Sequence, residues 1–285
     1  MWRSHVVAAL AFALLPACGA VDAGSDAPLT QAPNPNQRYE ADTTVLESPQ
    51  HGPMLCLGGI AESLPPQCGD IPITNWDWNA VEGEESVGGT RWGSYHVMGR
   101  FHGKSFTVIE TGPYRASARN VADEIETACP TPTGGWRALD QSRMSEAEFQ
   151  AANMAARSQP DFAGLWIDRL GMRDPNATDR GGFVLNAAFT DDLEDHESQL
   201  RALWGGPLCV TRHEHTLSDL QKVQNELMRE GGKEFGLHVL FSSVSETHNF
   251  VELGVVVIDD EAREALDARY GDGTVGVSAA LQPVP

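Results

Sequence analysis

Alternation of apolar and polar positions is clearest between residues 90 and 112. The apolar or small positions of this alternation are Tyr95, Val97, Gly99 and Phe101, followed after His102-Gly103 by Phe106 and Val108. A period of two is typical of a strand with one buried face, and a short turn between two such runs gives a hairpin. Together with the apolar run around residues 53–60, this pattern predicts a small antiparallel β unit over residues 44–112.

Residues 113–182 have a helical pattern instead. Ser145 and Glu148 have the spacing of a capping box, which favours a helix that starts there. In the segment 160–171, Phe162, Leu165, Trp166 and Leu170 recur at helical spacing. We therefore expect a helical connector between two larger blocks.

Strand and helix patterns alternate through residues 183–285. From Leu208 onward the predicted order is strand, helix, strand, strand, helix, strand, which is the ferredoxin-like βαββαβ arrangement. One further strand and helix precede it, over residues 183–204. The predicted fold class is therefore α+β: a small antiparallel β unit followed by a ferredoxin-like block with helices on one face of its sheet. No internal repeat is apparent in the sequence.

An apolar run lies near the start of the chain. Arg3 precedes ten apolar residues, Val6 to Leu15, a length too short to span a bilayer but typical of an export signal. Residues 18–43 are rich in Ala, Asp, Pro, Asn and Thr and offer little to bury. We expect residues 1–17 to be a signal peptide and residues 18–43 to be a disordered tether.

The end of this run, Leu15-Pro16-Ala17-Cys18, resembles the lipobox of bacterial lipoproteins. The resemblance implies that the peptide is cut before Cys18, that the Cys18 thiol carries a diacylglycerol, and that the new amine is acylated. It also implies a protein anchored by lipid outside the cytoplasm, at the cell membrane or the outer membrane. The alternative is an ordinary signal peptide with an incidental cysteine.

Four more cysteines follow Cys18, an even number that favours two disulfides in an exported protein. Three pairings are possible. We favour Cys56–Cys68 and Cys129–Cys209, because the first two lie in one block of the sequence and the last two in another. Their spacings match no zinc pattern.

The net charge of −20 excludes one class of function. Such a surface repels nucleic acid and anionic lipid headgroups, so we predict no nucleic-acid partner and attachment to the membrane through lipid. Neither G-x-S-x-G nor H-E-x-x-H occurs, and no glycine-rich phosphate loop is present. We therefore predict no catalytic residue and no cofactor.

Aromatic residues form the first candidate binding site. Trp76, Trp78 and Trp92 lie close in sequence to Tyr95 and to the acidic residues Asp77, Glu82, Glu84 and Glu85. Aromatic faces beside carboxylates can hold a sugar ring, which makes these tryptophans a possible ligand platform. The alternative is that they fill the core of a small β unit.

Histidines form the second candidate. His213 and His215 alternate on a predicted strand, so that both rings would share one face, and His196 on the preceding helix could supply a third metal ligand. The alternative interpretation, which we favour, is a pair of histidines facing solvent at a strand end.

Several segments are similar to uncharacterised secreted or lipid-anchored proteins of actinobacteria and related bacteria: SLPPQC, NWDWNAVEGEE, RWGSYHVMGRFHGKSFTV, GGPLCV and ALDARYG. This resemblance implies no activity. Residues 245–271 are also similar to propeptide modules of secreted serine proteases, which implies a folding-helper or inhibitor-like fold in the C-terminal block. We expect a binding or structural protein of the cell envelope with an unknown envelope ligand. The alternatives are a carbohydrate-active or carbohydrate-binding module and a protease-inhibitor-like module.

Overall fold

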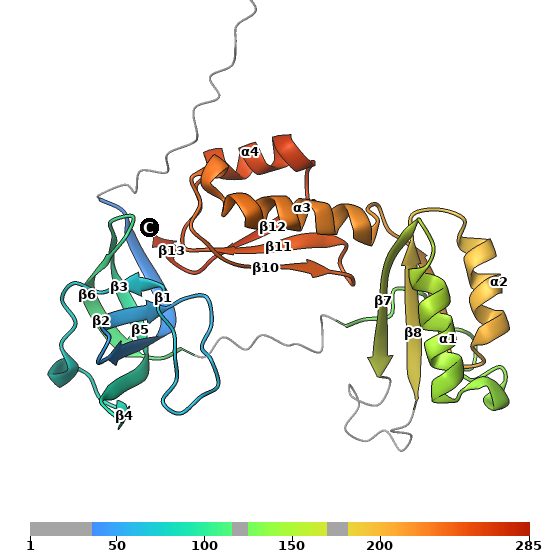
Figure 1. Cartoon of the computed structure of the whole chain (residues 1–285), viewed down its shortest axis with the longest axis horizontal. Coiled ribbons are helices and arrows are strands. Elements are labelled where there is room, and N and C mark those ends of the chain that lie inside the picture. Colours follow the sequence, from blue (N-terminus) through green and yellow to red (C-terminus); the bar gives the residue numbers. More distant parts are fainter. Residues whose placement is uncertain (1–35, 116–124, 170–181) are drawn as a thin grey trace, which may run out of the picture.

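A computed structural model describes residues 36–115, 125–169 and 182–285. The described residues form three units, each with its own β-sheet. Figure 1 shows the unit of residues 217–279 between the unit of residues 38–113 and the unit of residues 146–212. Cys18, the predicted signal peptide and most of the predicted tether lie outside the described residues.

The N-terminal β unit consists of residues 38–113. Its strands are β1 (Arg38–Ser48), β2 (His51–Cys56), β3 (Ile71–Pro72), β4 (Glu85–Val87), β5 (Thr90–Phe101) and β6 (Phe106–Pro113), with the 3-10 turn η1 (Trp78–Ala80) before β4. The strand order is β3-β2-β1-β5, with β4 and β6 also paired to β5. A bridge between Ile73 and Phe106 brings the end of β3 to β6, so the sheet closes on itself.

The C-terminus returns to this unit. The last strand, β13 (Gln282–Val284), pairs antiparallel with Arg38–Glu40 of β1. Val256, Val257 and Leu281 from the C-terminal block are buried in the same cluster as Val45, Leu55 and Phe106. The N-terminal β unit and the C-terminal block therefore share one hydrophobic core, although they are far apart in sequence.

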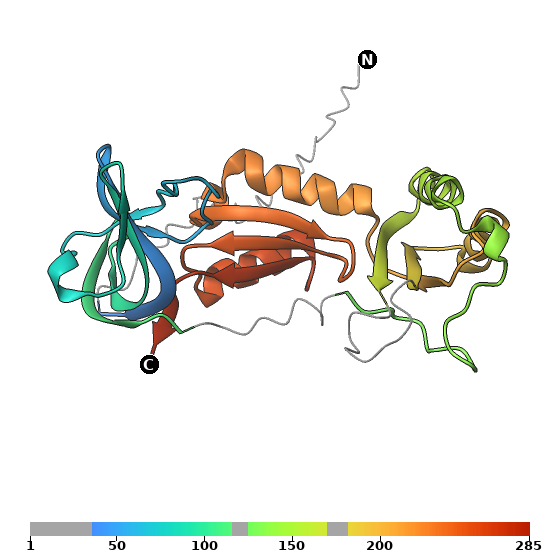
Figure 2. The same ribbon diagram turned by 90° about the horizontal axis from the view of Figure 1, so that it is seen from below.

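Two further units have the same order of elements. The first repeat contains α1 (Glu146–Arg157), β7 (Phe162–Arg169), β8 (Phe183–Phe189), α2 (Leu193–Leu203) and β9 (Leu208–Arg212), with η3 (Gln141–Arg143) before α1. The second repeat contains α3 (Leu217–Glu230), β10 (Val239–Ser245), β11 (Phe250–Val255), α4 (Asp260–Tyr270) and β12 (Val275–Ala279), with η4 (Lys233–Phe235) after α3. Figures 1 and 2 show both helices of the second repeat on the same face of its sheet.

The pairing of the strands is also duplicated. In each repeat the first two strands are antiparallel and the third runs parallel to the second, after a crossover helix. β8, α2 and β9 begin at residues 183, 193 and 208, and β11, α4 and β12 begin at 250, 260 and 275, which is 67 residues later in every case. The chain thus contains an internal structural repeat that the sequence pattern did not indicate.

Local sequence signals explain where the helices begin and end. Ser145 and Glu148 form the predicted capping box of α1, and Thr216 accepts a hydrogen bond from the Asp219 backbone at the start of α3. Gly231 ends α3 with a φ of 58°, a conformation that costs glycine little. Carboxylates in the first turn of α2 and α4 suit the positive end of the helix dipole.

The α+β class is confirmed, and several details of the prediction are corrected. β9 pairs with β8 and not with β10–β12, so β9 to β12 do not form the expected ferredoxin-like sheet. Residues 162–169 form a strand and are not part of a helical connector. The pattern misled the prediction because a short, nearly continuous apolar run fits a strand that is buried on both faces as well as a helix. β1 begins at Arg38, so residues 38–43 belong to the sheet and not to a tether.

In the part of the chain that the structure describes, no helix is both long and apolar enough to cross a bilayer.

Candidate functional site

The predicted tryptophan platform is divided between two faces of the N-terminal β unit. Trp76 and Trp78 pack edge to face, with ring centroids 5.5 Å apart, and Trp76 also lies 5.2 Å from the ring of Tyr95. Trp92 is three residues before Tyr95 on β5, so its side chain points to the opposite face of the strand. The structure therefore brings two of the three tryptophans together and leaves Trp92 apart.

Trp78 is held as part of the core. The Asp77 carboxylate accepts the Asn79 backbone N–H at 2.9 Å and starts the turn η1, which turns Trp78 inward. Only 8% of Trp78 is exposed, its indole N–H donates to Glu47, and the Arg91 guanidinium lies 5.5 Å from its ring. Because its faces are covered, Trp78 supports the site and cannot itself stack on a ligand.

A cleft of about 410 Å³ opens beside this aromatic cluster. Its lining is contributed by the segment after η1 and by the paired ends of β5 and β6: Ala80, Val81, Glu82, Ser94, Tyr95, Thr111, Gly112, Pro113 and Tyr114. Tyr114 is 48% exposed. The rings of Tyr95 and Tyr114, the carboxylate of Glu82 and the hydroxyl side chains of Ser94 and Thr111 therefore surround a space large enough for a small polar molecule.

Tyr95 is the unusual residue of this cleft. It is 4% exposed, and among the described residues its hydroxyl has no hydrogen-bond partner; the buried indole N–H of the adjacent Trp76 has none either. Burying a polar group without a partner costs about 1–3 kcal/mol. Burial, and secondarily the negative charge of Glu84, raises the pKa of Tyr95, so the hydroxyl stays protonated and able to donate.

Tyr95 can lie in this position because of a glycine on the same strand. A Cβ atom at Gly93 would come 2.8 Å or less from three atoms of the Tyr95 ring and hydroxyl. Gly93 and Tyr95 share the inner face of β5, so the ring covers the backbone at Gly93. The sequence pattern indicated that Tyr95 faces inward, but not that its hydroxyl would be buried without a partner.

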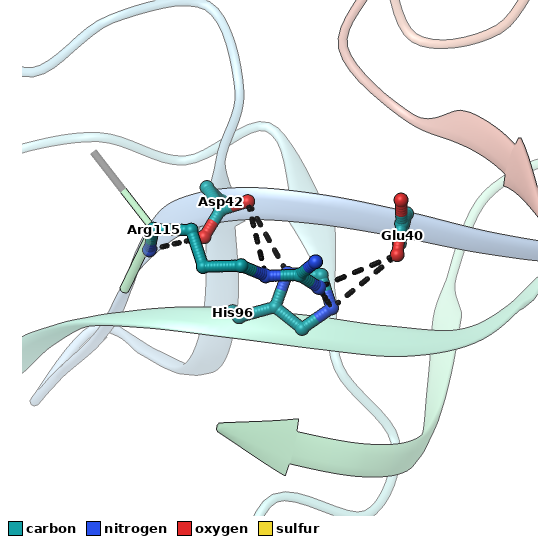
Figure 3. A network of polar contacts seen from close by, with 4 residues as sticks. All are labelled: Glu40, Asp42, His96 and Arg115. Atoms are coloured by element: carbon teal, nitrogen blue, oxygen red, sulfur yellow. Dashed lines mark hydrogen bonds and ion pairs between the residues drawn. The ribbon is translucent and has the colours of Figure 1, made fainter. Parts of the chain in front are cut away.

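A polar network on the outer face fixes one wall of the cleft. Figure 3 shows Glu40 and Asp42 from β1, His96 from β5 and Arg115 from the residues after β6. The Arg115 backbone N–H donates to Asp42 at 2.6 Å, and His96 Nδ1 lies 3.2 Å from the same carboxylate. The Arg115 side chain contacts Glu40 and the Nε2 atom of His96. These contacts hold the segment that contains Tyr114.

His96 lies between acidic and basic partners. Its Nδ1 atom is 3.2 Å from Asp42, and its Nε2 atom faces both the Arg115 side chain and Glu40, which lies 3.5 Å away. Sequence reasoning did not single out this network. The available signal was the pair Glu40 and Asp42, two carboxylates at alternate positions that must share one face of a strand.

The acidic residues of the aromatic region have separate positions. Glu82 lines the cleft, Asp77 is used in the turn at Trp78, and Glu85 lies in β4 opposite Trp92. Of the described residues that line the cleft, Glu82 alone carries a carboxylate. A pair of carboxylates facing each other is therefore not part of this lining.

The three candidate histidines do not converge. His213 stacks on Trp166 with centroids 5.8 Å apart, His215 Nε2 lies 3.3 Å from the Thr274 hydroxyl, and His196 Nε2 lies 2.8 Å from Asp161. β9 ends at Arg212, so His213 and His215 follow the strand and do not lie on it as we expected. No group of three His, Cys, Asp or Glu side chains suited to a metal ion occurs among the described residues.

Both disulfides have the predicted pairing. The Cα atoms of Cys56 and Cys68 are 5.4 Å apart, and those of Cys129 and Cys209 are 5.7 Å apart. The first closes a loop beside β2, and the second ties residue 129 to β9 of the first repeat. Two disulfides indicate a protein that folds in an oxidising environment outside the cytoplasm.

No protein-family model matches the chain, and the comparison with curated proteins gives no match.

Proposed function

We propose that this chain is a lipid-anchored extracytoplasmic protein that binds a carbohydrate in the Tyr95 cleft. The observation that carries the proposal is Tyr95, a residue of the lining of a 410 Å³ cleft whose buried hydroxyl has no partner among the described residues. A small displacement of the cleft wall on binding would let a ligand hydroxyl accept from Tyr95, which would remove the cost of the unpaired group.

The lining suits a sugar more than an apolar ligand. The exposed ring of Tyr114 can cover the apolar face of a pyranose, and Ser94, Thr111 and Glu82 can exchange hydrogen bonds with its hydroxyl groups. The site is small, which favours a monosaccharide or the end of a longer glycan.

Binding is better supported than hydrolysis. Most glycosidases use two carboxyl groups on either side of the bond that breaks. Since Glu82 is the one carboxylate among the described lining residues, we propose recognition of the sugar without turnover.

The anchor is a separate part of the proposal and rests on sequence. The lipobox-like Leu15-Pro16-Ala17-Cys18 supports acylation of Cys18, and the two disulfides are what an exported protein carries. We also propose a protein of the cell envelope as a partner, and we assign no surface of the chain to it.

The test is isothermal calorimetry of the purified protein against a panel of neutral, acidic and N-acetylated sugars. We expect binding by the wild type and a loss of about 3- to 10-fold in affinity for Tyr95→Phe, the effect of one hydrogen bond. The same variant should unfold at a higher temperature in the absence of sugar, because it no longer buries an unpaired hydroxyl.

The matched control is Tyr270→Phe, the same change on α4. It should leave sugar binding as in the wild type. Failure of the wild type to bind any sugar of the panel, or an equal loss in both variants, contradicts the proposed site.

A further inference from the structure

The lining of the Tyr95 cleft carries a negative charge without a positive counterpart. Glu82 is exposed and, among the described residues, pairs with no cation. Of the described residues that line the cleft, none is an arginine, a lysine or a histidine. A bound molecule with a positive charge would therefore meet a carboxylate that no other group neutralises.

The arginines closest in sequence to the lining are held by other partners. Arg115 comes directly after the last lining residue, and its side chain lies 3.4 Å from Glu40 and 4.0 Å from Asp42 (Figure 3). The Arg91 guanidinium lies 5.5 Å from the centre of the Trp78 ring. Neither arginine belongs to the lining or pairs with its carboxylate.

The negative charge extends beyond Glu82. Burial, and then the charge of nearby Glu84, raises the pKa of the Tyr95 hydroxyl, which places a second carboxylate in the neighbourhood of the cleft. The chain as a whole has a net charge of −20. Such charges attract cations and repel anions, so the cleft disfavours an acidic sugar and favours a cationic one.

Tyr114 adds a second feature that suits an organic cation. Its side chain lines the same cleft and is 48% exposed. The face of a tyrosine ring attracts an ammonium group that lies within about 6 Å of the ring centre. A calcium ion would need about six to eight oxygen ligands, whereas the described lining offers one carboxylate. The lining thus fits an ammonium group better than a metal ion.

We propose that the Tyr95 cleft selects sugars that carry a protonated amino group, and that Glu82 determines this specificity. The ammonium group donates to the Glu82 carboxylate, which leaves Ser94 and Thr111 to bind hydroxyl groups of the sugar. This inference rests on the proposed sugar site and adds to it the class of sugar that binds.

The experiment is isothermal calorimetry of the purified full chain at about pH 6, where the amine of glucosamine is protonated. The other ligands are glucose, N-acetylglucosamine and glucuronic acid, in which the amino group is absent, neutralised as an amide or replaced by a negative charge elsewhere on the ring. We expect glucosamine to bind about 3- to 10-fold more tightly than glucose or N-acetylglucosamine, the effect of one exposed charge pair together with an aromatic face. Glucuronic acid should bind most weakly, and added salt should reduce the preference for glucosamine.

Glu82→Gln tests the residue, because it keeps the size of the side chain and removes its charge. In this variant glucosamine and glucose should bind equally, whatever change is common to both. The matched control is Glu110→Gln, the same substitution at an exposed position of β6 outside the lining. It should retain the wild-type preference for glucosamine.

The outcomes separate this inference from the proposed function. Equal binding of glucose and glucosamine by the wild type, or a preference for glucosamine that survives in Glu82→Gln, overturns the inference and leaves the proposed sugar site in place. Failure of the wild type to bind any of these sugars overturns both. Ethanolamine, an amine without a sugar ring, should bind more weakly than glucosamine, and an equal affinity would contradict selection of an amino sugar.

Discussion

His213 is a titratable residue in an unfavourable place for a charge. Its ring stacks on Trp166, and its buried Nδ1 atom has no partner among the described residues. Burial, followed by the nearby positive charge of His248, lowers the pKa of His213. The folded protein therefore holds this ring neutral at a pH where an unfolded chain would protonate it.

This gives a pH dependence with a definite sign. As the pH falls below the ordinary histidine value of about 6.5, the unfolded state binds a proton that the folded state resists, so the free energy of unfolding decreases. His213→Phe keeps a ring against Trp166 and removes the titration. Urea unfolding at pH 7.5, 6.5 and 5.5 should show a smaller loss of stability in this variant than in the wild type.

The exposed His238 provides the control. His238→Phe should keep the wild-type dependence on pH, since this side chain lies in solvent. Equal pH dependence in the wild type and His213→Phe contradicts the assignment.

At the residue scale, the sequence predicted classes of side chain better than their roles. It placed Trp76, Trp78 and Tyr95 in one β unit, but the choice between packing and binding depended on which rings are covered. Trp78 is covered by contacts with Glu47 and Arg91, which precede and follow it by 31 and 13 positions. The Tyr95 hydroxyl is unpaired because the fold places no donor or acceptor of the described residues beside it. Which groups lie beside it depends on residues distant in the sequence, so no local pattern predicts it.

At the scale of elements, one contact between the two repeats requires a glycine. Gly164 of β7 lies against the turn between β10 and β11, where Glu246 accepts the Leu165 backbone N–H at 2.8 Å and pairs with Arg157 at 3.3 Å. A Cβ atom at Gly164 would come 2.6 Å from the backbone oxygen of Glu246. Backbone atoms cannot rotate away as a side chain can.

Gly164→Ala should therefore destabilise the protein by about 1–3 kcal/mol, the usual cost of overpacking. The measurement is the free energy of unfolding in urea. Gly52→Ala is the control, because a Cβ atom at Gly52 meets nothing within 4 Å. A cost for Gly164→Ala no larger than that for Gly52→Ala would contradict this prediction, because it would show that β7 and the backbone at Glu246 can move apart without loss of stability.

The boundaries of the helices were predictable where caps mark them, as at Ser145 and Thr216. The strand β7 was not predictable in this way, because the spacing of Phe162, Leu165 and Trp166 fits both one face of a helix and a buried strand. The repeat was missed although some identity survives at the 67-residue spacing. Phe183-Val184 recurs as Phe250-Val251, and the N-caps Asp192 and Asp259 of α2 and α4 correspond. These matches are scattered, and apolar strand positions and acidic helix starts occur in many unrelated segments.

At the scale of the whole molecule, the proposed lipid anchor at Cys18 would determine where the protein works. Cys18→Ser should leave an unprocessed precursor and abolish labelling with palmitate, because the serine hydroxyl cannot replace the thiol that receives the diacylglycerol. The measurement is gel mobility together with incorporation of labelled palmitate into the full chain. Palmitate that still enters the variant shows that the lipid is attached elsewhere or that labelling is nonspecific.

The pairing of the cysteines could be predicted because four cysteines allow only three pairings. The hydrophobic core that the N-terminal β unit shares with the C-terminal block could not be predicted. Val256, Val257 and Leu281 read as ordinary strand residues of the C-terminal block. Their burial beside Val45 and Phe106 depends on how whole units pack, which is a long-range property of the chain.

The pairing of β13 with β1 has a mechanical consequence. β1 pairs with β5 along most of its length, with β13 at its first residues and with β2 at its last residues. The first strand of the sheet is therefore hydrogen-bonded on both sides. Tension arriving through the preceding residues would have to slide this strand past its neighbours and break many bonds together, instead of peeling them one at a time. If the protein is held through this end, as we propose, the folded unit would keep its shape when the attachment is pulled.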